Sequence, residues 1–525
     1  MVKYLFKRLL RGLISVLIVV AIVMILIYSL MNRDLVFSMD TVLSKQNNNA
    51  KVTYKYAQWE RFGYLDYVPY ADYINELFED GEIDAETRDN VVKFGRKAKN
   101  DSDVVAEYVA KFTEYYESRG YEVIRLDAVM QGKKKVANGG QQALFATKDK
   151  TLLNRLGTYF KNLVSVDNIH YVDEDLDIGK RGLTFTWRDP AYGGEKFSPA
   201  IMGNGTKYKY LVYFDSKFPF FHQNLITINL GVSYSVNMGV DVFDTMTKSQ
   251  GSYVQRDVVY PSGVEEFSAD DLHSATYMKD SREANSLNKK YYVDDYTNVI
   301  TFKNGRSKLG YSFILGIISS ALAYFIGVPV GIVMARRKDK LFDHIGTVYI
   351  VFIIAVPSLA YIFLVKAIGY GIGLPTVFDL ESQSKLMYLL PIVSLSLPSI
   401  ASLMRWLRRY MIDQMNSDYV KFARSGGLSE NEIFTKHILK NAIIPIVHGI
   451  PGTILFAMTG AIITERVYVV PGAGNLLTKA INAYDNSVIV GVVLFYAILS
   501  VISVILGDIL MSIVDPRISF TSKAR

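Results

Sequence analysis

Six long apolar stretches constrain this chain more than any other feature of its sequence. A bilayer hydrocarbon core about 30 Å thick is crossed by a helix of roughly 20 mostly apolar residues, which is close to the length of each stretch. Half of the 525 residues are apolar, so a disordered chain and an ordinary soluble enzyme both fit poorly. The sequence therefore predicts a membrane α-helical protein with six transmembrane helices. The stretches are residues 12–31, 309–335, 345–369, 386–404, 442–464 and 488–514.

The first stretch follows four basic residues, Lys3, Lys7, Arg8 and Arg11. Such a head is also typical of a secretory signal peptide, so cleavage is the alternative interpretation. The apolar core is as long as a spanning helix, however, and the sequence SLMNRD (29–34) has no small-x-small cleavage site. We therefore expect a retained signal anchor.

Basic residues gather beside alternate ends of the apolar stretches, and such residues stay on the cytoplasmic side of a membrane. The two short loops on the other side, 370–385 and 465–487, carry few of them. We predict a multi-pass plasma-membrane protein with both termini in the cytoplasm and residues 32–308 outside. The basic segments placed inside are 3–11, 336–340, 405–440 and 515–525.

Three regions follow from this topology. Residues 1–31 form the cytoplasmic N-terminus and the first transmembrane helix, and residues 32–308 form a large extracytoplasmic domain inserted after that helix. Residues 309–525 form a five-helix membrane domain, whose main cytoplasmic loop covers 405–441.

The extracytoplasmic domain is tyrosine-rich and predicted to be mixed α+β. Asp84 is a suitable cap for a helix over 84–97, which begins with acidic residues and ends with basic ones. A second helix is expected over 103–118, closed by Gly120. This domain docks a delivery protein, covers an entrance as a lid, or serves as a spacer, and its composition leaves these alternatives open. Strand-like composition marks 121–127, 208–214 and 224–230.

Motifs for catalysis and metal binding are missing from the sequence. There is no cysteine, which excludes disulfides, thiolate metal sites and thiol catalysis. We find no GxxxxGK[ST] phosphate loop, no HExxH and no GxSxG elbow. We expect a chain that is not an enzyme, binds no metal or cofactor, and cannot power any process with ATP alone.

Few ionisable residues interrupt the apolar stretches. Lys366 lies near the outer end of the third stretch, and Asp508 lies near the inner end of the last, within reach of water or Arg517. Glu465 and Arg466 follow the fifth stretch and can pair with each other. Charges near helix ends do not favour an ion relay, which needs acids near the bilayer centre.

Prolines and glycines interrupt several of the apolar stretches. Lipid tolerates such breaks only where neighbouring groups satisfy the freed backbone. Ordinary packing of kinked helices is one interpretation; the other is that the kinks line a passage through the membrane. The candidate residues are Pro357, Ser358, Pro398, Gly449 and Pro451.

The polar segment YVKFARSGGLSENEIFTKH (419–437) predicts two short amphipathic helices that meet at a glycine corner. Ser417 or Asp418 can cap the first helix, and Ser429 with Glu432 forms the capping-box pattern of the second. Helices this short are marginal alone and need a surface to pack against. A cytoplasmic protein is the natural partner, and the lipid headgroups are the alternative. The apolar positions at helical spacing are Tyr419, Phe422 and Ala423, then Ile433, Phe434, His437 and Ile438.

This segment resembles the cytoplasmic loop of permease subunits of ABC importers, in the oligopeptide and dipeptide branch, which reads YVxxARxxGLS...HxLxNAxxP. Lys421 and Lys440 depart from the general importer motif, as is usual in this branch. The resemblance covers 1–31 and about 229–525, interrupted between 245 and 308. The long insertion over 32–224 resembles the larger B-type subunits of streptococcal-like oligopeptide systems, which implies a Gram-positive cell surface. Further matches in family order are NLGVSY (229–234), GVPVGIVMA (327–335), VPS (356–358), PGAGNLL (471–477) and DPR (515–517).

The resemblance implies a type I ABC importer permease with a defined set of partners. A surface lipoprotein captures peptide, this chain and a homologous second permease form the path within membrane lipid, and two cytoplasmic ATP-binding subunits drive transport. No nucleic acid is expected as a partner. The hairpin then couples the chain to an ATPase, through Tyr419, Phe422, Ala423, Arg424, Gly427, Leu428, Ser429, Glu432 and His437.

Alternatives remain at the level of substrate and class. The same branch also carries nickel, sugars and haem, so peptide follows from closeness of resemblance. A non-transporting receptor or scaffold would need only one span as an anchor, and an ion-coupled transporter would show intramembrane acids or inverted repeats.

Overall fold

The computed structural model describes residues 2–137, 139–166, 181–192, 194–214, 220–278, 282–382 and 384–514. Four helices are each long and apolar enough to cross a membrane, or up to six spans exist if each of two bent helix pairs counts as one. The expected DPR segment (515–517) and the C-terminal basic tail lie outside the described residues. The four helices are α1 (Val2–Leu30), α10 (Lys308–Arg336), α13 (Leu389–Met415) and α20 (Asn486–Val514).

The third apolar stretch does not form one straight span. Its two halves, α11 (Leu341–Ala355) and α12 (Ser358–Gly371), meet at 113°. Proline has no N–H for the helix ladder and forces the preceding residue into extended backbone. Val356, before Pro357, accordingly has ψ 130°. The interruption expected at Pro357 is therefore confirmed, and 345–369 is a single span only if the bent pair counts as one. Pro398, by contrast, is accommodated inside α13 without a break.

The fifth stretch is also bent, by 42° between Glu430–His448 and Ile450–Thr459. Gly449 and Pro451 stand at this break, with Pro451 in the first turn of the second helix, where a missing N–H costs nothing. The elements are α16 (Lys440–Ala442), α17 (Ile444–His448), α18 (Ile450–Tyr468) and α19 (Ala473–Asn482), and η7 (Lys385–Tyr388) precedes α13.

The helical core is centred on α10 and α13, which approach closely because glycines face the contact. A Cβ at Gly327 would lie 3.0 Å from the Leu403 Cβ, and one at Gly331 would lie 3.3 Å from the Met404 Cα. Small residues permit this backbone approach, and membrane helices associate by such packing. The sequence expectation of small-residue helix contacts is confirmed here.

Helix α1 packs antiparallel against α20. The Arg8 Nε lies 2.7 Å from Asp508 Oδ2, so the start of α1 is beside the end of α20. His448 Nε2, at the end of α17, lies 3.5 Å from the other oxygen of Asp508. Among the described residues Asp508 thus pairs with Arg8, and the start of α1 and the end of α20 lie on one side of the helical core. Arg517, which was expected within reach of Asp508, lies outside the described residues.

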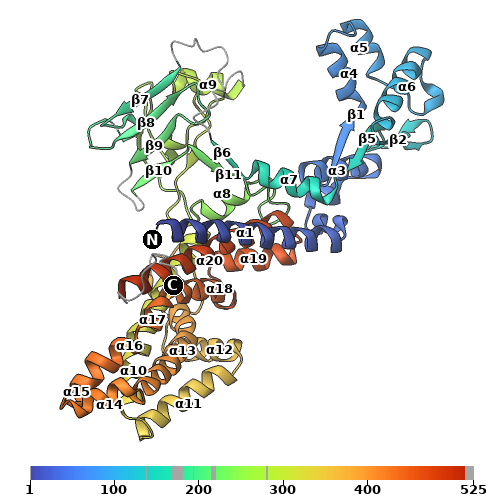
Figure 1. The fold of residues 1–525 in the computed structure, drawn as a ribbon. Coiled ribbons are helices and arrows are strands. Elements are labelled where there is room, and N and C mark those ends of the chain that lie inside the picture. Colours follow the sequence, from blue (N-terminus) through green and yellow to red (C-terminus); the bar gives the residue numbers. More distant parts are fainter. Residues whose placement is uncertain are drawn as a thin grey trace.

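The described residues between 32 and 307 form two lobes and a connecting segment, at the end of the molecule opposite to α14 and α15 (Figure 1). The first lobe contains a three-stranded antiparallel sheet in the order β1-β5-β2, covered by helices whose core includes Tyr70, Ile74 and Phe112. Its elements are α2 (Thr41–Lys45), α3 (Asn48–Arg61), β1 (Leu65–Pro69), α4 (Tyr70–Glu79), α5 (Ala85–Val91), α6 (Asp103–Glu117), β2 (Glu122–Leu126), β3 (Met130–Gln131), β4 (Lys134–Lys135) and β5 (Ala143–Asp149).

Sequence expectations for this lobe hold except at one helix end. The helix over 103–118, the strand over 121–127 and the Asp84 cap are confirmed, and Asp84 accepts from the Thr87 N–H at 2.8 Å. The helix that Asp84 starts ends at Val91, however, six residues early. Asp101 explains this, because its Oδ1 accepts from the Gly95 N–H at 2.6 Å and Arg125 holds the carboxylate in place.

The second lobe contains a four-stranded antiparallel sheet in the order β10-β9-β8-β7. Strands expected over 208–214 and 224–230 are present as β9 and the shorter β11. Between the lobes, α7, the β6-β11 pair and α8 lie next to α1 (Figure 1). The elements of the second lobe and of the segment between the lobes are α7 (Leu152–Asn162), β6 (Val164–Val166), β7 (Gly182–Thr186), β8 (Ala200–Asn204), β9 (Tyr210–Phe214), β10 (Phe221–Gln223), β11 (Ile226–Ile228), α8 (Val242–Thr247), β12 (Arg256–Val259), β13 (Glu265–Ser268), β14 (Asp270–Asp271), α9 (Arg282–Lys290) and β15 (Ile300–Thr301).

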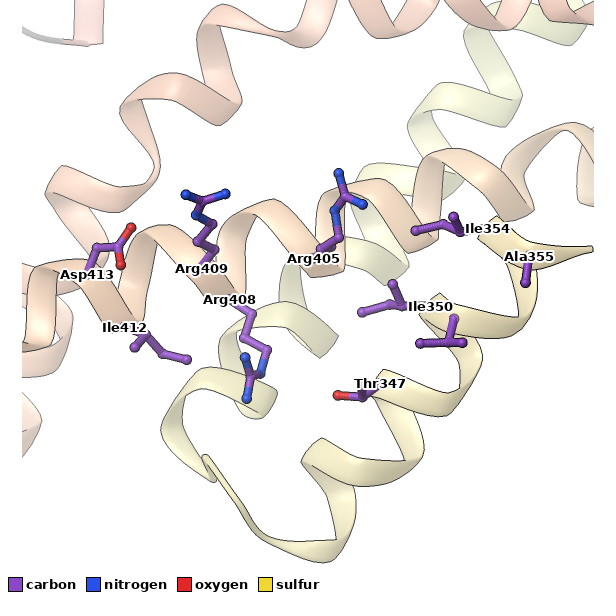
Figure 2. Close-up of a pocket in the computed structure, with 10 residues that line it drawn as sticks. Thr347, Ile350, Ile354, Ala355, Arg405, Arg408, Arg409, Ile412 and Asp413 are labelled. Atoms are coloured by element: carbon purple, nitrogen blue, oxygen red, sulfur yellow. The ribbon is translucent and has the colours of Figure 1, made fainter.

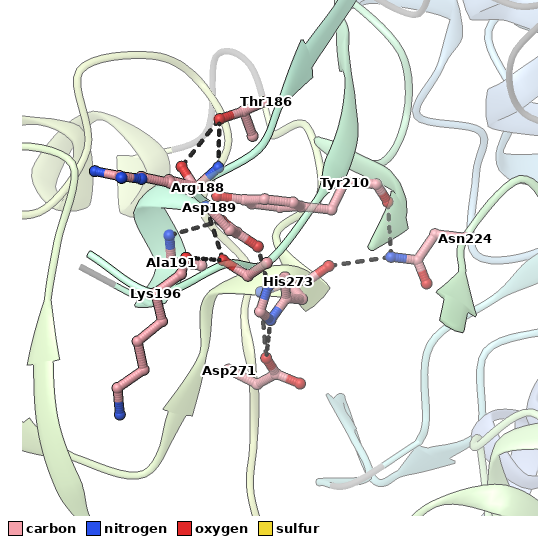
Figure 3. Close-up of polar contacts among 10 residues, drawn as sticks. Thr186, Arg188, Asp189, Ala191, Lys196, Tyr210, Asn224, Asp271 and His273 are labelled. Atoms are coloured by element: carbon pink, nitrogen blue, oxygen red, sulfur yellow. Dashed lines mark hydrogen bonds and ion pairs between the residues drawn. The ribbon is translucent and has the colours of Figure 1, made fainter. Parts of the chain in front are cut away.

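A buried histidine joins the strands of the second lobe (Figure 3). His273 Nε2 lies 2.6 Å from Asp189 Oδ2, and its Nδ1 lies 3.3 Å from Asp271 Oδ1. The Tyr213 ring stacks on the imidazole at 4.1 Å, and Asn224 donates to the His273 carbonyl at 3.0 Å. Burial alone would lower the pKa of His273, but the bonds to the two carboxylates outweigh it and raise the pKa.

A pH dependence follows from this arrangement. A histidine whose pKa is raised by folding stabilises the fold fully below its unfolded pKa of about 6.5 and loses that contribution as pH rises through the folded value. We expect the second lobe to lose stability as the pH rises from about 6.5 through the raised pKa of folded His273. His273→Gln, which keeps a donor for Asp189 but no charge, should cost about 1–2 kcal/mol at pH 6 and flatten the profile. Thermal unfolding of the full chain at several pH values measures both; an equally steep profile in the variant would contradict the assignment.

Candidate functional site

The polar segment forms the hairpin expected from its sequence, defined here as residues 418–439. The first helix is α14 (Asp418–Ser425), and the second begins with α15 (Glu430–Glu432) and continues as a π-helical turn, η8 (Ile433–Leu439). Gly427 has φ +80°, a left-handed conformation that favours glycine, and this closes α14. The glycine corner is therefore a backbone requirement at Gly427.

The caps of the two helices differ. Ser429 and Glu432 form the expected capping box, with the Ser429 Oγ 3.3 Å from the Glu432 N–H and the Glu432 carboxylate 3.2 Å from the Ser429 N–H. Ser417 occupies the cap position of α14, but its hydroxyl donates backwards to the Gln414 carbonyl. Asp418 pairs with Lys421 at 2.9 Å instead. The expected side-chain cap of α14 is thus wrong, because both candidates have other partners.

The first helix of the hairpin buries one face and exposes the other. Val420 and Ala423 are buried in the helical core, whereas the Phe422 side chain is 79% exposed and Tyr419 and Leu428 are also exposed. The three apolar positions Tyr419, Phe422 and Ala423 therefore do not form one buried stripe. An exposed Phe beside exposed Tyr and Leu is an apolar patch of the kind that marks an interaction surface.

Polar contacts hold the corner of the hairpin. Arg424 makes a two-point ion pair with Glu430, at 2.6 Å and 3.1 Å, across the Gly426-Gly427 break. The same contact lowers the pKa of Glu430 below its ordinary value. The pair is exposed, so it orients the two helices more than it stabilises them.

The hairpin is anchored to the long helices through its second half. Ile433, Phe434 and Ile438 are buried in the helical core, and His437 is half-buried. Arg336, at the end of α10, donates to Asn431 at 2.5 Å. A displacement of the hairpin would therefore be transmitted to α10 and α13 as a packed unit.

Tyr419 adds a second anchor. Its hydroxyl donates to Gln414 of α13 at 2.5 Å and accepts from Asn441 of α16 at 3.1 Å. Lys421 and Lys440, which depart from the general importer motif, are both exposed. Phe422 is exposed as well.

The predicted kink residues lie at three different places. Pro357 and Ser358 form the break between α11 and α12, Gly449 and Pro451 form the break between α17 and α18, and Pro398 lies inside α13. The structure does not gather them in one of the cavities described below, so a path along them stays a prediction.

A large cavity of about 850 Å³ opens where α10 and α13 start, at the lobe end of the helical core. Both signs of charge line it, with Arg306 and Lys385 beside Asp379 and Glu381. Aromatic and aliphatic side chains from α10 and η7, among them Tyr311 and Tyr388, form its remaining wall. Mixed charge over an apolar wall suits a ligand that carries both charges and apolar groups.

Sequence reasoning missed a buried carboxylate, Asp485, which ties the lobes to the helices. Its Oδ2 accepts from the Ser233 hydroxyl at 2.6 Å and from the N–H groups of Tyr234, Ser235 and Val236 at 3.0–3.1 Å. Asp485 is fully buried. Its partners lie about 250 residues away in sequence, so no local pattern could have revealed the contact.

Two further polar contacts were also missed. Glu465 was expected to pair with Arg466, but it accepts from the Ser312 hydroxyl at 2.6 Å and from the Asn475 N–H at 2.9 Å. Asp343 is buried and holds Arg408 at two points, 2.5 Å and 2.6 Å. The PGAGNLL motif (471–477) could have signalled the first contact, because it carries the N–H group that Glu465 binds.

Comparison with known proteins gives the class of membrane transport subunit to which the chain belongs. The family model described as a binding-protein-dependent transport system inner membrane component matches residues 327–520. The chain is 35% identical to the oligopeptide transport system permease protein AmiC of Streptococcus pneumoniae, over 100% of this chain and 99% of that protein. The chain therefore belongs to this family of transport permeases, and it is a multi-pass membrane protein.

Other relatives match less than half of this chain. The dipeptide transport system permease protein DppB of Lactococcus lactis is 32% identical over 42% of this chain and 73% of that protein. Inward-facing structures of the MetNI methionine ABC transporter match 40% of this chain and 94% of that chain, with 14% identity and a TM-score of 0.33.

Proposed function

We propose that this chain is the permease subunit of an ATP-driven oligopeptide importer, that it forms half of the translocation path, and that a cytoplasmic ATPase drives it through the hairpin. The observation that carries the coupling role is the exposed Phe422 on a hairpin otherwise packed into the helical core. The peptide substrate is supported by the full-length relative, which is named an oligopeptide permease and matches the inserted lobes as well as the helices. Hydrolysis of ATP is assigned to partner subunits.

The coupling would work as a rigid-body transition between two arrangements. Phe422, with Tyr419 and Leu428, seats in a groove of the ATPase, and closure of the ATPase dimer displaces the hairpin. Ile433 and Phe434 then carry the displacement into the packed helices. Coupling requires that the ATPase contact these residues differently in the two states.

We propose that the hairpin and both ends of the chain lie in the cytoplasm and that the two lobes lie outside. The Arg8–Asp508 pair supports a shared side for both ends. The opposite positions of the lobes and the hairpin support the two-sided arrangement (Figure 1). The cell is proposed to be Gram-positive, as its streptococcal relative is.

Peptide would enter through the 850 Å³ cavity at the lobe end. It would then pass the helix breaks at Pro357, Ser358, Gly449 and Pro451, and Pro398 within the continuous helix α13. Charges of both signs at the entrance suit the two termini of a peptide. A homologous second permease supplies the other half of the path, and an extracellular peptide-binding lipoprotein delivers the substrate.

Co-purification tests the proposal as a whole. The full chain, purified from its native membrane, should bring a second permease, two ATP-binding subunits and a peptide-binding lipoprotein, identified by mass spectrometry. Uptake assays with labelled peptide, nickel and haem separate peptide from the other substrates of the branch. A chain that purifies alone, as a receptor or scaffold would, overturns the proposal.

The second lobe offers a candidate surface for the binding protein. Trp187 is 61% exposed and lies beside the edge strand β7. The centroid of its ring system lies 4.7 Å from the centroid of the Phe185 ring and 5.9 Å from that of the Phe197 ring. Exposed aromatic clusters are enriched at protein interfaces. Phe185→Ala with Trp187→Ala should weaken binding of the lipoprotein by roughly tenfold or more. Phe267→Ala, similarly exposed on β13 of the same lobe, serves as the control, and equal binding by both variants would exclude this surface.

A further inference from the structure

A cavity of about 520 Å³ lies between α11 and α13, near the hairpin end of the helical core (Figure 2). The two helices run antiparallel, so the start of α11 is level with the end of α13. Thr347, Ile350, Val351 and Ile354 line one side, and Arg405 and Arg409 line the other. Neither side belongs to the coupling hairpin or to the predicted path.

The basic side of the cavity carries charge that the chain does not neutralise. Arg408 is occupied by Asp343. In the described ranges, Arg405 and Arg409 make no ion pair; their guanidinium groups lie 5.1 Å and 5.5 Å from the Trp406 ring. The single acid in the lining, Asp413, leaves the wall with an excess of positive charge.

The other side of the cavity is apolar. Val351 and Ile354 are more than half exposed, although they belong to one of the apolar stretches. Ile350, deeper between the helices, is buried. An occupant must therefore offer an anion at one end and apolar surface along the rest of its length.

We propose that this cavity binds an anionic phospholipid. Its phosphate lies between Arg405 and Arg409, because arginine pairs with phosphate at two points, and its acyl chain lies along Ile350, Val351 and Ile354. Basic pockets between transmembrane helices on the cytoplasmic side bind anionic headgroups in this way. A soluble anion would leave the apolar wall uncovered.

The position has a consequence for the hairpin. Helix α13 ends at Met415, and α14 starts three residues later, at Asp418. A lipid bound between α11 and α13 therefore contacts the helix that leads directly into the hairpin.

Lipid binding to the full chain with its co-purifying partners tests this inference. Native mass spectrometry in detergent would follow titration with phosphatidylglycerol and with phosphatidylcholine. We expect retention of phosphatidylglycerol above phosphatidylcholine in the parent chain, and a loss of affinity on the order of tenfold or more in Arg405→Gln/Arg409→Gln. Arg337→Gln/Lys338→Gln removes two exposed charges from the adjacent loop and should leave retention unchanged.

A second measurement places the lipid. Because the chain has no cysteine, Val351→Cys provides a single site for a fluorophore, which spin-labelled phosphatidylglycerol should quench in nanodiscs. Equal retention by the arginine and loop variants overturns the inference, as does displacement by millimolar inorganic phosphate, which would indicate a free-anion site. Crosslinking of Val351→Cys to the second permease in place of quenching also overturns it, since a protein would then fill the cavity.

Discussion

Replacing Gly427 with valine should abolish substrate uptake while leaving the chain in the membrane. Gly427 has φ +80°, where a side chain costs about 1–2 kcal/mol and a β-branched one more. A Cβ added at this position would have no other atom within 4 Å, so the effect comes from the backbone alone. Relief of that strain would reorient α14 against the second helix and separate Phe422 from its ATPase groove. Uptake in cells, together with ATPase co-purification, measures the result.

The adjacent glycine is a matched control. Gly426 has φ −77°, and a Cβ there would make ordinary contacts of 3.5 Å. Gly426→Ala should therefore keep near-normal uptake. Normal uptake and normal ATPase co-purification in Gly427→Val would refute the coupling role of the hairpin.

Replacing Asp485 with alanine should loosen the contact between residues 233–236 and the helices. The change removes the acceptor of four donors in residues 233–236. A buried donor left without a partner costs about 1–3 kcal/mol. Limited proteolysis of the connection near residue 235, and thermal unfolding of the purified full chain, measure the loss.

Asp485→Asn keeps one acceptor oxygen and should lose much less stability than the alanine variant. Ser235→Ala removes a hydroxyl that donates to the Ala483 carbonyl but leaves its N–H on Asp485. An unchanged unfolding temperature and cleavage rate in Asp485→Ala would show that other contacts hold the segment.

Parts of the site could be predicted because they rest on local chemistry. Ser429 and Glu432 stand three residues apart, and Gly427 follows a short amphipathic helix, so the two helices and their corner are encoded within the single segment 418–439. The apolar stretches that became α1, α10, α13 and α20 were recognisable for the same reason, since length and composition set the ability to cross a bilayer.

Other parts could not be predicted from spacing. Tyr419, Phe422 and Ala423 have the same helical period, yet Ala423 is buried and Phe422 is exposed. Which of two apolar faces packs inward depends on the helices that surround α14. The bend at Pro357 likewise needed the structure, because Pro398 stands in a similar sequence and leaves α13 continuous.

The sequence by itself determined the membrane class, the apolar stretches, the capped hairpin and the family resemblance, all of which depend on composition or on residues close together in the chain. The tertiary structure alone decided which carboxylates are held, and by what. Asp343 pairs with Arg408, which is 65 residues away in the sequence. Asp485 accepts a hydrogen bond from the N–H group of Tyr234, which is 251 residues away. A buried carboxylate is stable only where donors converge on it, and the fold brings those donors together from distant parts of the chain.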